Sequence, residues 1–168
     1  MSPVPHPLSH VNAVTAEEFV RIVGPAFEHS AWIAEGVAAQ RPFFSVEALH
    51  TALCAVVREA SEAQQLALIR AHPDLVGQVV LTAESQGEQF AAGLTDLSPE
   101  EVALFDRHNR DYQTRFGFPF VICVRLNKKN AILAAFPVRL KNPRRDEIAT
   151  ALAEIFKIAR LRLADLIA

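Results

Sequence analysis

The sequence predicts an all-α fold, a single compact bundle of about seven to eight helices. Helix-capping motifs and a long stretch of helical apolar periodicity near the C-terminus favour this class. Only one run, Val121–Leu126, has the composition of a strand. A lone strand has no partner for its backbone, so we expect extended backbone or the start of a helix there.

Capping motifs mark two of the predicted helix starts. Thr15-Ala16-Glu17-Glu18 has the Ser/Thr-x-x-Glu form, in which the hydroxyl and the carboxylate each bond the other residue's backbone N–H. Ser98-Pro99-Glu100-Glu101 adds a proline at the first helical position and two acids at the positive end of the helix dipole. One helix is expected to begin at Thr15 and another at Ser45. A short helix should pass through Leu66 and Ile69 and end at His72-Pro73. Further helices should run from Ser98 to about Phe116, with a stop at Gly117, and from about Asp146 to Ile167.

The last of these helices is the most clearly amphipathic. Its apolar residues repeat at the helical period and form one stripe: Ile148, Leu152, Ile155, Phe156, Ala159, Leu163 and Leu166. Such a stripe is typical of a helix that packs one face against a core.

Size and composition indicate one globular domain. A chain of 168 residues, 51% hydrophobic and 21% charged, can bury a core without metal or disulfides. The net charge of -2 gives no field that would attract nucleic acid or anionic lipid, and no apolar run is long enough to cross a bilayer. We expect residues 1–12 to be a flexible, proline-rich tail without a secretory signal, and residues 13–168 to form the helical domain. Elimination then places the protein in the cytoplasm.

The two cysteines, Cys54 and Cys123, lie in apolar runs and have no CxxC partner. This pattern indicates buried thiols in a reducing compartment. A disulfide between them stays possible, but the spacing gives it no support.

The stretch Ala71-His72-Pro73-Asp74-Leu75 is the first that could carry chemistry. Proline after histidine disfavours helix at His72, so the imidazole should lie at a turn of the chain. An imidazole is the usual general acid or base near neutral pH. The helix dipole alone also favours a histidine at a helix C-terminus, so a structural role stays open.

The stretch Thr82–Gln89 is the second. If it is helical, Ser85, Glu88 and Gln89 share one face and could hold a small polar ligand, with free N–H groups at the helix start adding affinity for an anion. The spacing Ser85-x-x-Glu88 equally fits a capping box, in which both side chains bind the backbone. The sequence does not separate these interpretations.

The stretch Arg115–Ile122 is the third. Gly117 and Pro119 make a non-helical bend that carries three phenylalanines, including Phe118. Such a segment can line an apolar pocket or fill the core between two helices.

Arg160 and Arg162 of the last helix form the fourth candidate set, since both lie at the borders of the apolar stripe. Either arginine could reach solvent or turn inward toward an anion. His6 and His10 have the i, i+4 spacing of metal ligands, but no carboxylate accompanies them in the proline-rich tail, so we expect no metal site. The sequence contains no GxSxG, HExxH, GxGxxG or phosphate-loop motif.

Taken together, these stretches resemble the family of decarboxylases that act on 2-oxo-4-hydroxy-4-carboxy-5-ureidoimidazoline (OHCU), a compound formed downstream of urate. The matching pieces follow the family's order: His72-Pro73-Asp74-Leu75, Thr82-x-x-Ser85-x-x-Glu88-Gln89-x-x-Ala92-Gly93-Leu94, Asn109-x-x-Tyr112-x-x-x-Phe116-Gly117-Phe118-Pro119-Phe120, Arg139-Leu140-x-Asn142, and Glu147 with Ile158-Ala159-Arg160-Leu161. Each piece alone is weak, whereas the ordered set is specific. Val76 departs from the pattern, because the family commonly has a smaller residue there.

The resemblance implies an all-helical, usually dimeric enzyme that produces (S)-allantoin, with His72 as the catalytic histidine and Glu88 central in the site. The residues it implies to contact the substrate are Pro73, Ser85, Gln86, Gly87, Glu88, Gln89, Phe118, the backbone around Ile122, and Arg160.

No cofactor is expected for this reaction. A decarboxylation needs an acceptor for the electron pair, which many decarboxylases obtain from pyridoxal phosphate or thiamine diphosphate. In OHCU the carboxylate lies next to a ring C=N bond, so the substrate supplies its own acceptor. We expect His72 to act as general acid/base in an enzyme that binds this small molecule as a homodimer.

Two alternatives stay open. The first is a decarboxylase or related lyase of the same fold that acts on another small heterocyclic acid, which only a panel of substrates would distinguish. The second is a non-catalytic helical adaptor, which should expose a large apolar groove instead of a polar pocket. Convergence of His72, Glu88 and Arg160 on one cavity would argue against the adaptor.

Overall fold

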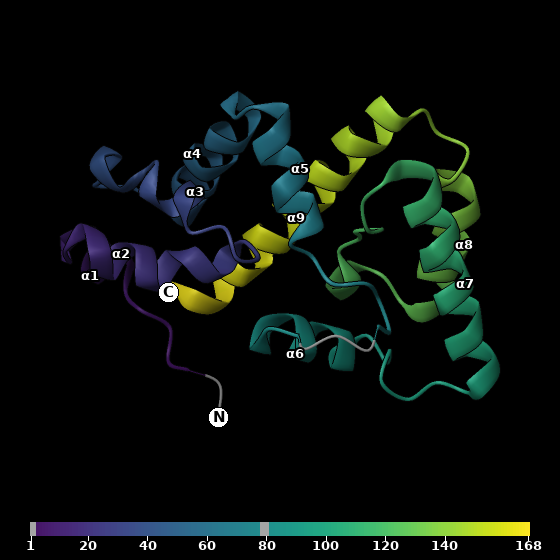
Figure 1. The fold of residues 1–168 in the computed structure, drawn as a ribbon. Helices are drawn as coiled ribbons and strands as arrows, with labels where there is room; N and C mark the ends of the chain where they lie inside the picture. Colours follow the sequence, from purple (N-terminus) through teal and green to yellow (C-terminus); the bar gives the residue numbers. More distant parts are fainter. Residues whose placement is uncertain (1–2, 78–80) are drawn as a thin grey trace. The chain divides into compact units, whose positions relative to one another are not determined.

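The computed structural model describes residues 3–77 and 81–168, which form nine α-helices and three short 3-10 helices without a β-strand (Figure 1). The all-α prediction is therefore confirmed. The α-helices are α1 Leu8–Ala13, α2 Ala16–Val23, α3 Trp32–Glu35, α4 Val46–Glu59, α5 Glu62–Arg70, α6 Ala83–Ala91, α7 Pro99–Phe116, α8 Lys129–Arg139 and α9 Arg144–Leu166, and the 3-10 helices are η1 Gly24–Ala26, η2 Ala38–Gln40 and η3 Val124–Leu126. None of these helices has the length and apolar character that a membrane span requires.

Hydroxyl caps begin several helices, as the sequence predicts. The Thr15 hydroxyl accepts the backbone N–H of Glu18 (3.2 Å), and the Ser45 hydroxyl accepts an N–H in the first turn of α4 (3.0 Å). At Ser98 both halves of the capping box are present. The box predicted at Thr15 is only half formed, because the Glu18 carboxylate accepts hydrogen bonds from Arg21 instead.

Several boundaries differ from the prediction. Helices α1, α3 and α8 were not anticipated, and α9 starts at Arg144, slightly before Asp146. Helix α8 contains Pro137 and has no side-chain cap at Lys128, so neither of the usual local signals marks it. The strand-like run Val121–Leu126 is extended as far as Cys123, and its last residues form η3. Both of the conformations expected there, extended backbone and the start of a helix, are therefore present.

The N-terminal segment expected to be a flexible tail contains most of α1. The His6 N–H donates to the Leu166 carbonyl (2.8 Å), and the Ala168 N–H donates to the His6 carbonyl (2.9 Å). In the structure the described part of this segment is thus bonded to the C-terminal end of the chain. Its motion in solution and the domain boundary at residue 13 stay predictions.

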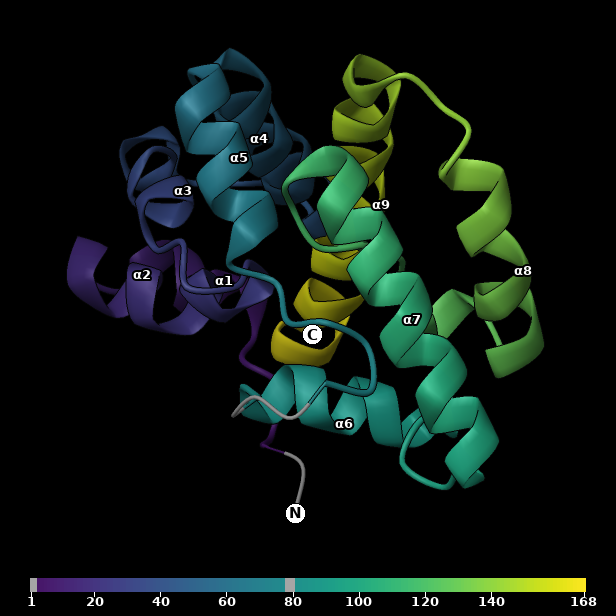
Figure 2. The ribbon, with the colours of Figure 1, turned by 45° about the vertical axis from the view of Figure 1, so that its right-hand side comes forward.

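Residue contacts divide the chain into two compact units, one made of residues 1–68 and 156–168 and the other of residues 69–155. In the first unit, α2 packs against α1 and α3, and α3 packs against α4 (Figure 2). A buried ion pair joins two distant parts of this unit. The Arg162 guanidinium lies 2.8 Å from the Glu28 carboxylate, with side chains 5% and 1% exposed.

In the second unit, α7 and α8 lie side by side (Figures 1 and 2). Aromatic rings fill the space between them: Phe120 stacks on Phe136 with ring centroids 3.8 Å apart, and Tyr112 meets Phe120 edge-on at 5.3 Å. All three side chains are almost completely buried. The bend that follows α7 therefore contributes Phe120 to the core of this unit.

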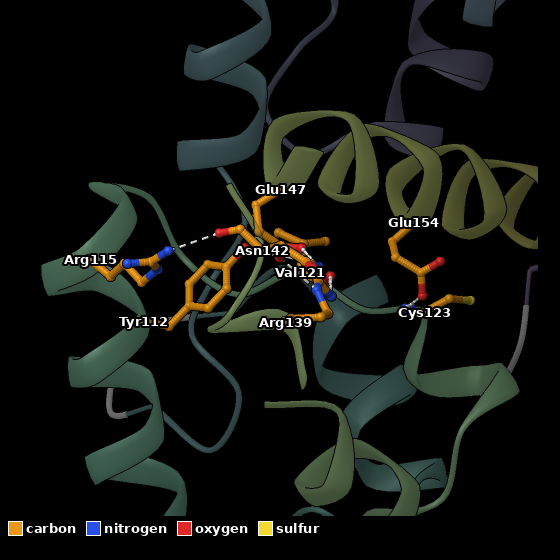
Figure 3. A network of polar contacts seen from close by, with 8 residues as sticks. All are labelled: Tyr112, Arg115, Val121, Cys123, Arg139, Asn142, Glu147 and Glu154. Carbon is orange, nitrogen blue, oxygen red and sulfur yellow. Dashed lines mark hydrogen bonds and ion pairs between the residues drawn. The ribbon is translucent and has the colours of Figure 1, made fainter. Parts of the chain in front are cut away.

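A buried polar network, shown in Figure 3, includes Arg139, whose guanidinium carbon lies 4.2 Å from the centroid of the Phe120 ring. Glu147 is completely buried, and its carboxylate accepts hydrogen bonds from Tyr112 Oη (2.6 Å), Arg139 Nε (2.7 Å) and Asn142 Nδ2 (2.9 Å). Arg139 Nη1 in turn donates to the Val121 carbonyl (2.6 Å). Burial and the bond to Glu147 raise the pKa of Tyr112, so the phenol stays a hydrogen-bond donor.

Replacing Glu147 with Gln should destabilise the protein strongly. The change leaves the Arg139 guanidinium buried without its counter-ion, which should cost about 3–5 kcal/mol in the free energy of unfolding. Urea titration followed by circular dichroism measures this loss.

The control for this prediction is Asp106→Asn, which removes an exposed ion pair with Arg110 in the same unit. Its effect should stay below about 1 kcal/mol, because solvent screens the pair. Equal stability changes in the two variants would contradict the role given to Glu147.

Cys54 and Cys123 are both free and buried, as predicted. Burial raises the pKa of the Cys54 thiol to about 11. Burial also raises the pKa of the Cys123 thiol, although hydrogen bonds from the backbone of η3 oppose the shift. A raised pKa leaves less of the nucleophilic thiolate at any pH below it.

The native protein should therefore react slowly with DTNB (a thiol-specific disulfide reagent) at pH 8, and both thiols should react rapidly in urea. With a pKa of about 11, roughly 0.1% of the Cys54 thiol is ionised at pH 8. The absorbance of the released thiol measures both rates. Rapid native reaction of either cysteine would contradict the burial.

Candidate functional site

His72 lies directly after α5, at the turn that the following proline predicts. Its backbone N–H donates to the Ile69 carbonyl (3.1 Å), and the residue is only 7% exposed. Pro73 is half-buried beside it. Burial, followed by repulsion from Asp106, raises the pKa of Asp74 in the same turn. The imidazole is thus held in a largely buried, non-helical segment of the second unit.

Helix α6 presents the polar face that the sequence predicts. Ser85 and Gln89 are buried and Glu88 is half-buried, whereas Gln86 and Gly87 are exposed. The substrate contacts expected from Gln86 and Gly87 stay predictions.

The N-cap of α6 is Thr82, whose hydroxyl accepts the backbone N–H of Ser85 (3.2 Å). Ser85 therefore lies inside the helix and does not open it. The interpretation of Ser85-x-x-Glu88 as a capping box is wrong.

Two buried amide side chains connect the segment after His72 to the helices around it. Gln89 Oε1 accepts the backbone N–H of Val76 (3.2 Å), and Asn109 Nδ2 donates to the Leu75 carbonyl (2.7 Å). The structure thereby brings the His72 segment and the polar face of α6 together. Sequence reasoning gave Asn109 no role, because its partner is 34 residues away and no local pattern links them.

Phe118 and Ile122 belong to a buried, extended segment between α7 and η3. Their residues are 0% and 8% exposed. On either side of Ile122, the Val121 carbonyl accepts from Arg139 (2.6 Å) and the Cys123 N–H donates to Glu154 (3.3 Å). Ile122 itself forms no hydrogen bond to any residue that the structure describes, and the ligand contact expected from its backbone stays a prediction.

The polar face of α6 lies close to this segment. Helix α6 packs against η3, and the Glu88 carboxylate contributes, after burial, to the raised pKa of Cys123. An imidazole, a carboxylate, buried amides and an apolar backbone segment thus belong to one unit of the protein. This combination can bind a small polar ring and transfer protons to it.

The two candidate arginines of α9 differ in their contacts. Arg162 is paired with the buried Glu28 and donates to the Pro25 carbonyl (3.1 Å), so it holds the first unit together. Arg160 has a side chain 37% exposed and pairs with Glu47, also in the first unit. The meeting of Arg160 with His72 and Glu88 stays a prediction.

His6 and His10 do not gather metal ligands around them. Their rings stack with centroids 5.6 Å apart, and no group of three potential ligands occurs among the residues that the structure describes.

Comparison with known proteins gives a consistent result. The family model described as OHCU decarboxylase matches residues 12–164. A 2-oxo-4-hydroxy-4-carboxy-5-ureidoimidazoline decarboxylase of Haloferax volcanii is 42% identical over 158 residues, which cover 94% of each chain. The enzyme of the same name from Amia calva is 40% identical over 164 residues, with 95% of this chain and 94% of the relative covered.

Solved structures agree with these relatives. The crystal structure of an (S)-allantoin synthase superposes with a TM-score of 0.78 at 28% identity, covering 95% of this chain and 54% of that one. An OHCU decarboxylase crystallised in the presence of (S)-allantoin gives a TM-score of 0.69 at 25% identity, covering 88% and 95%. Sequence and fold together show that this chain belongs to the OHCU decarboxylase family.

Proposed function

We propose that the protein decarboxylates OHCU to (S)-allantoin during the breakdown of urate. The observation that carries this proposal is the match to curated decarboxylases over nearly the full length of both chains. This match argues against the adaptor alternative. If the protein acted on a different heterocyclic acid, a substrate panel would show faster turnover of that acid than of OHCU.

The substrate itself can accept the electron pair that decarboxylation releases. When the bond between C4 and the carboxylate breaks, CO2 leaves and the electron pair forms a C4=C5 double bond. The π electrons of the adjacent ring C=N bond move to nitrogen, which takes up a proton. Loss of the proton from the C4 hydroxyl and addition of a proton at C5 then give allantoin, and delivery to one face of C5 makes a single enantiomer.

The protein orients the ring and controls these proton transfers. We assign the transfers to His72, because its imidazole lies in the buried turn that Gln89 connects to α6. Glu88 would bind the C4 hydroxyl or the ureido N–H groups. The other contacts assigned to the substrate come from Pro73, Ser85, Gln86, Gly87, Gln89, Phe118, the backbone of Ile122, and Arg160.

The apolar side of the site suits the leaving group. Phe118 is completely buried and Ile122 nearly so. Neutral CO2 can depart from apolar side chains of this kind without breaking polar contacts. Arg160 would bind a ureido or ring carbonyl and not the carboxylate that departs. Stabilising that carboxylate in the ground state, where its charge disappears in the transition state, would raise the barrier.

The protein acts in this proposal as a homodimer in the cytoplasm. Sedimentation velocity of the purified chain should give the mass of a dimer, and a monomer at micromolar concentration would contradict the dimer.

Replacing His72 with Ala should lower kcat/KM by about 100-fold or more and abolish the preference for one enantiomer, because the proton donor is lost. Circular dichroism of freshly generated OHCU follows both the rate and the optical activity of the product.

His72→Gln, which retains more of the side-chain volume, repeats the test if the alanine variant is unstable. His10→Ala serves as the control, because this exposed histidine belongs to the first unit and is not among the proposed substrate contacts. Unimpaired turnover in a folded His72 variant would overturn the assignment.

Replacing Glu88 with Gln should reduce turnover by about 10- to 100-fold with little change in melting temperature, since the carboxylate serves the substrate more than the fold. Glu84→Gln is the matched control, because Glu84 is exposed on the first turn of the same helix. A Glu88 variant that loses stability but keeps its activity would show that the carboxylate is structural.

A further inference from the structure

One peptide group in the His72 segment is bound at both of its polar atoms. The Leu75 carbonyl accepts from Asn109 Nδ2 (2.7 Å), and the Val76 N–H of the same peptide donates to Gln89 Oε1 (3.2 Å). The two amides come from different helices, Asn109 from α7 and Gln89 from α6. This peptide follows His72 closely in the chain, so the two amides fix the segment that carries the imidazole.

The backbone at this peptide requires such support. Val76 has φ of 60°, in the left-handed region that β-branched residues rarely adopt. The turn also contains a hydrogen bond between backbone groups, from the Gly77 N–H to the Asp74 carbonyl, but this bond is long at 3.4 Å. A strained conformation persists only where surrounding contacts enforce it, and here the amides of Asn109 and Gln89 supply these contacts.

A buried asparagine at position 109 lowers the stability of the core, so packing alone does not explain its presence. It is 7% exposed, and its Oδ1 has no hydrogen-bond partner among the residues that the structure describes. Because the Leu75 carbonyl can only accept, the Nδ2 group must point toward it and Oδ1 must point away. A buried polar group with an unsatisfied atom weakens a core, so stability alone does not account for it.

We propose that Asn109 is a positioning residue for the decarboxylation, which acts with Gln89 by holding the Leu75–Val76 peptide and thereby the imidazole of His72. This inference rests on the proposed function, since it concerns the same reaction. Asn109 acts through His72 and does not need to touch the substrate. Proton transfer depends on the distance and angle of the donor, so a displaced imidazole lowers kcat more than it raises KM.

Asn109→Leu tests the proposal, because leucine has a similar volume but cannot donate to the Leu75 carbonyl. We expect kcat to fall by about tenfold or more while KM changes by less than about twofold. The optical purity of the allantoin should also fall, because the proton reaches C5 less selectively. The melting temperature should also fall, because the buried Leu75 carbonyl loses its donor, although the substitution removes the unsatisfied oxygen as well.

Asn12→Leu is the matched control in the first unit. Asn12 also binds a loop through its amide, with Nδ2 donating to the Phe43 carbonyl (2.9 Å) and Oδ1 accepting the Phe43 N–H (2.8 Å). This variant should lose stability and keep kcat within about twofold. An equal loss of kcat in both variants would mean that the effect of Asn109 is general destabilisation, and the proposal would be overturned.

A double variant separates this inference from the proposed function. In the His72→Ala background, adding Asn109→Leu should cause no further loss of rate, because its effect passes through the imidazole. The same fold-loss in both backgrounds, or an unchanged kcat in Asn109→Leu alone, would overturn the positioning role. Full activity of His72→Ala would instead overturn the assignment of proton transfer to His72, and failure of the unmodified protein to decarboxylate OHCU would overturn the proposed function. If Asn109→Leu does not fold, Asn109→Ser is measured in the same assays with the same criteria.

Discussion

Non-helical backbone in the second unit depends on hydrogen bonds from buried side chains. An extended segment in an all-helical protein has no neighbouring strand to bond its N–H and C=O groups. Asn109 and Gln89 bind the peptide after His72, while Arg139 and Glu154 bind the backbone on either side of Ile122. His72 and Ile122, two of the residues proposed to act on the substrate, lie on these supported segments.

The support of the Ile122 segment extends through a series of buried contacts. Arg139 binds the Val121 carbonyl, and Glu147 neutralises Arg139 and is itself bonded by Tyr112 and Asn142. Helices α7, α8 and α9 all contribute to holding one carbonyl in place. Without the Glu147 carboxylate, burial of the Arg139 guanidinium would cost too much free energy. The stability of the unit and the geometry of the Ile122 segment are therefore linked. Preorganised segments of this kind suit an enzyme that must orient a ring before a proton moves.

Local sequence signals predicted the class of the fold and the turn at His72, because caps and periodicity act within a few residues. The proline after His72 and the box at Ser98 are such signals, and the structure bears them out. Helix α8 was missed because Pro137 argues against a helix, and the sequence left the role of Ser85 open because Ser85-x-x-Glu88 also fits a capping box, whereas the cap is Thr82. The bond from Asn109 to Leu75 had no signal, since it joins side chain and backbone across a long stretch of chain. Only the family resemblance assigned chemical roles to His72, Glu88 and Arg160.

The most direct test of the account is the reaction of the unmodified protein with freshly generated OHCU, followed by circular dichroism beside a protein-free sample. The account predicts that the protein accelerates loss of the substrate signal and that the product has the dichroism of (S)-allantoin alone. Loss of OHCU at the protein-free rate, or formation of racemic allantoin in the presence of a folded protein, would contradict it.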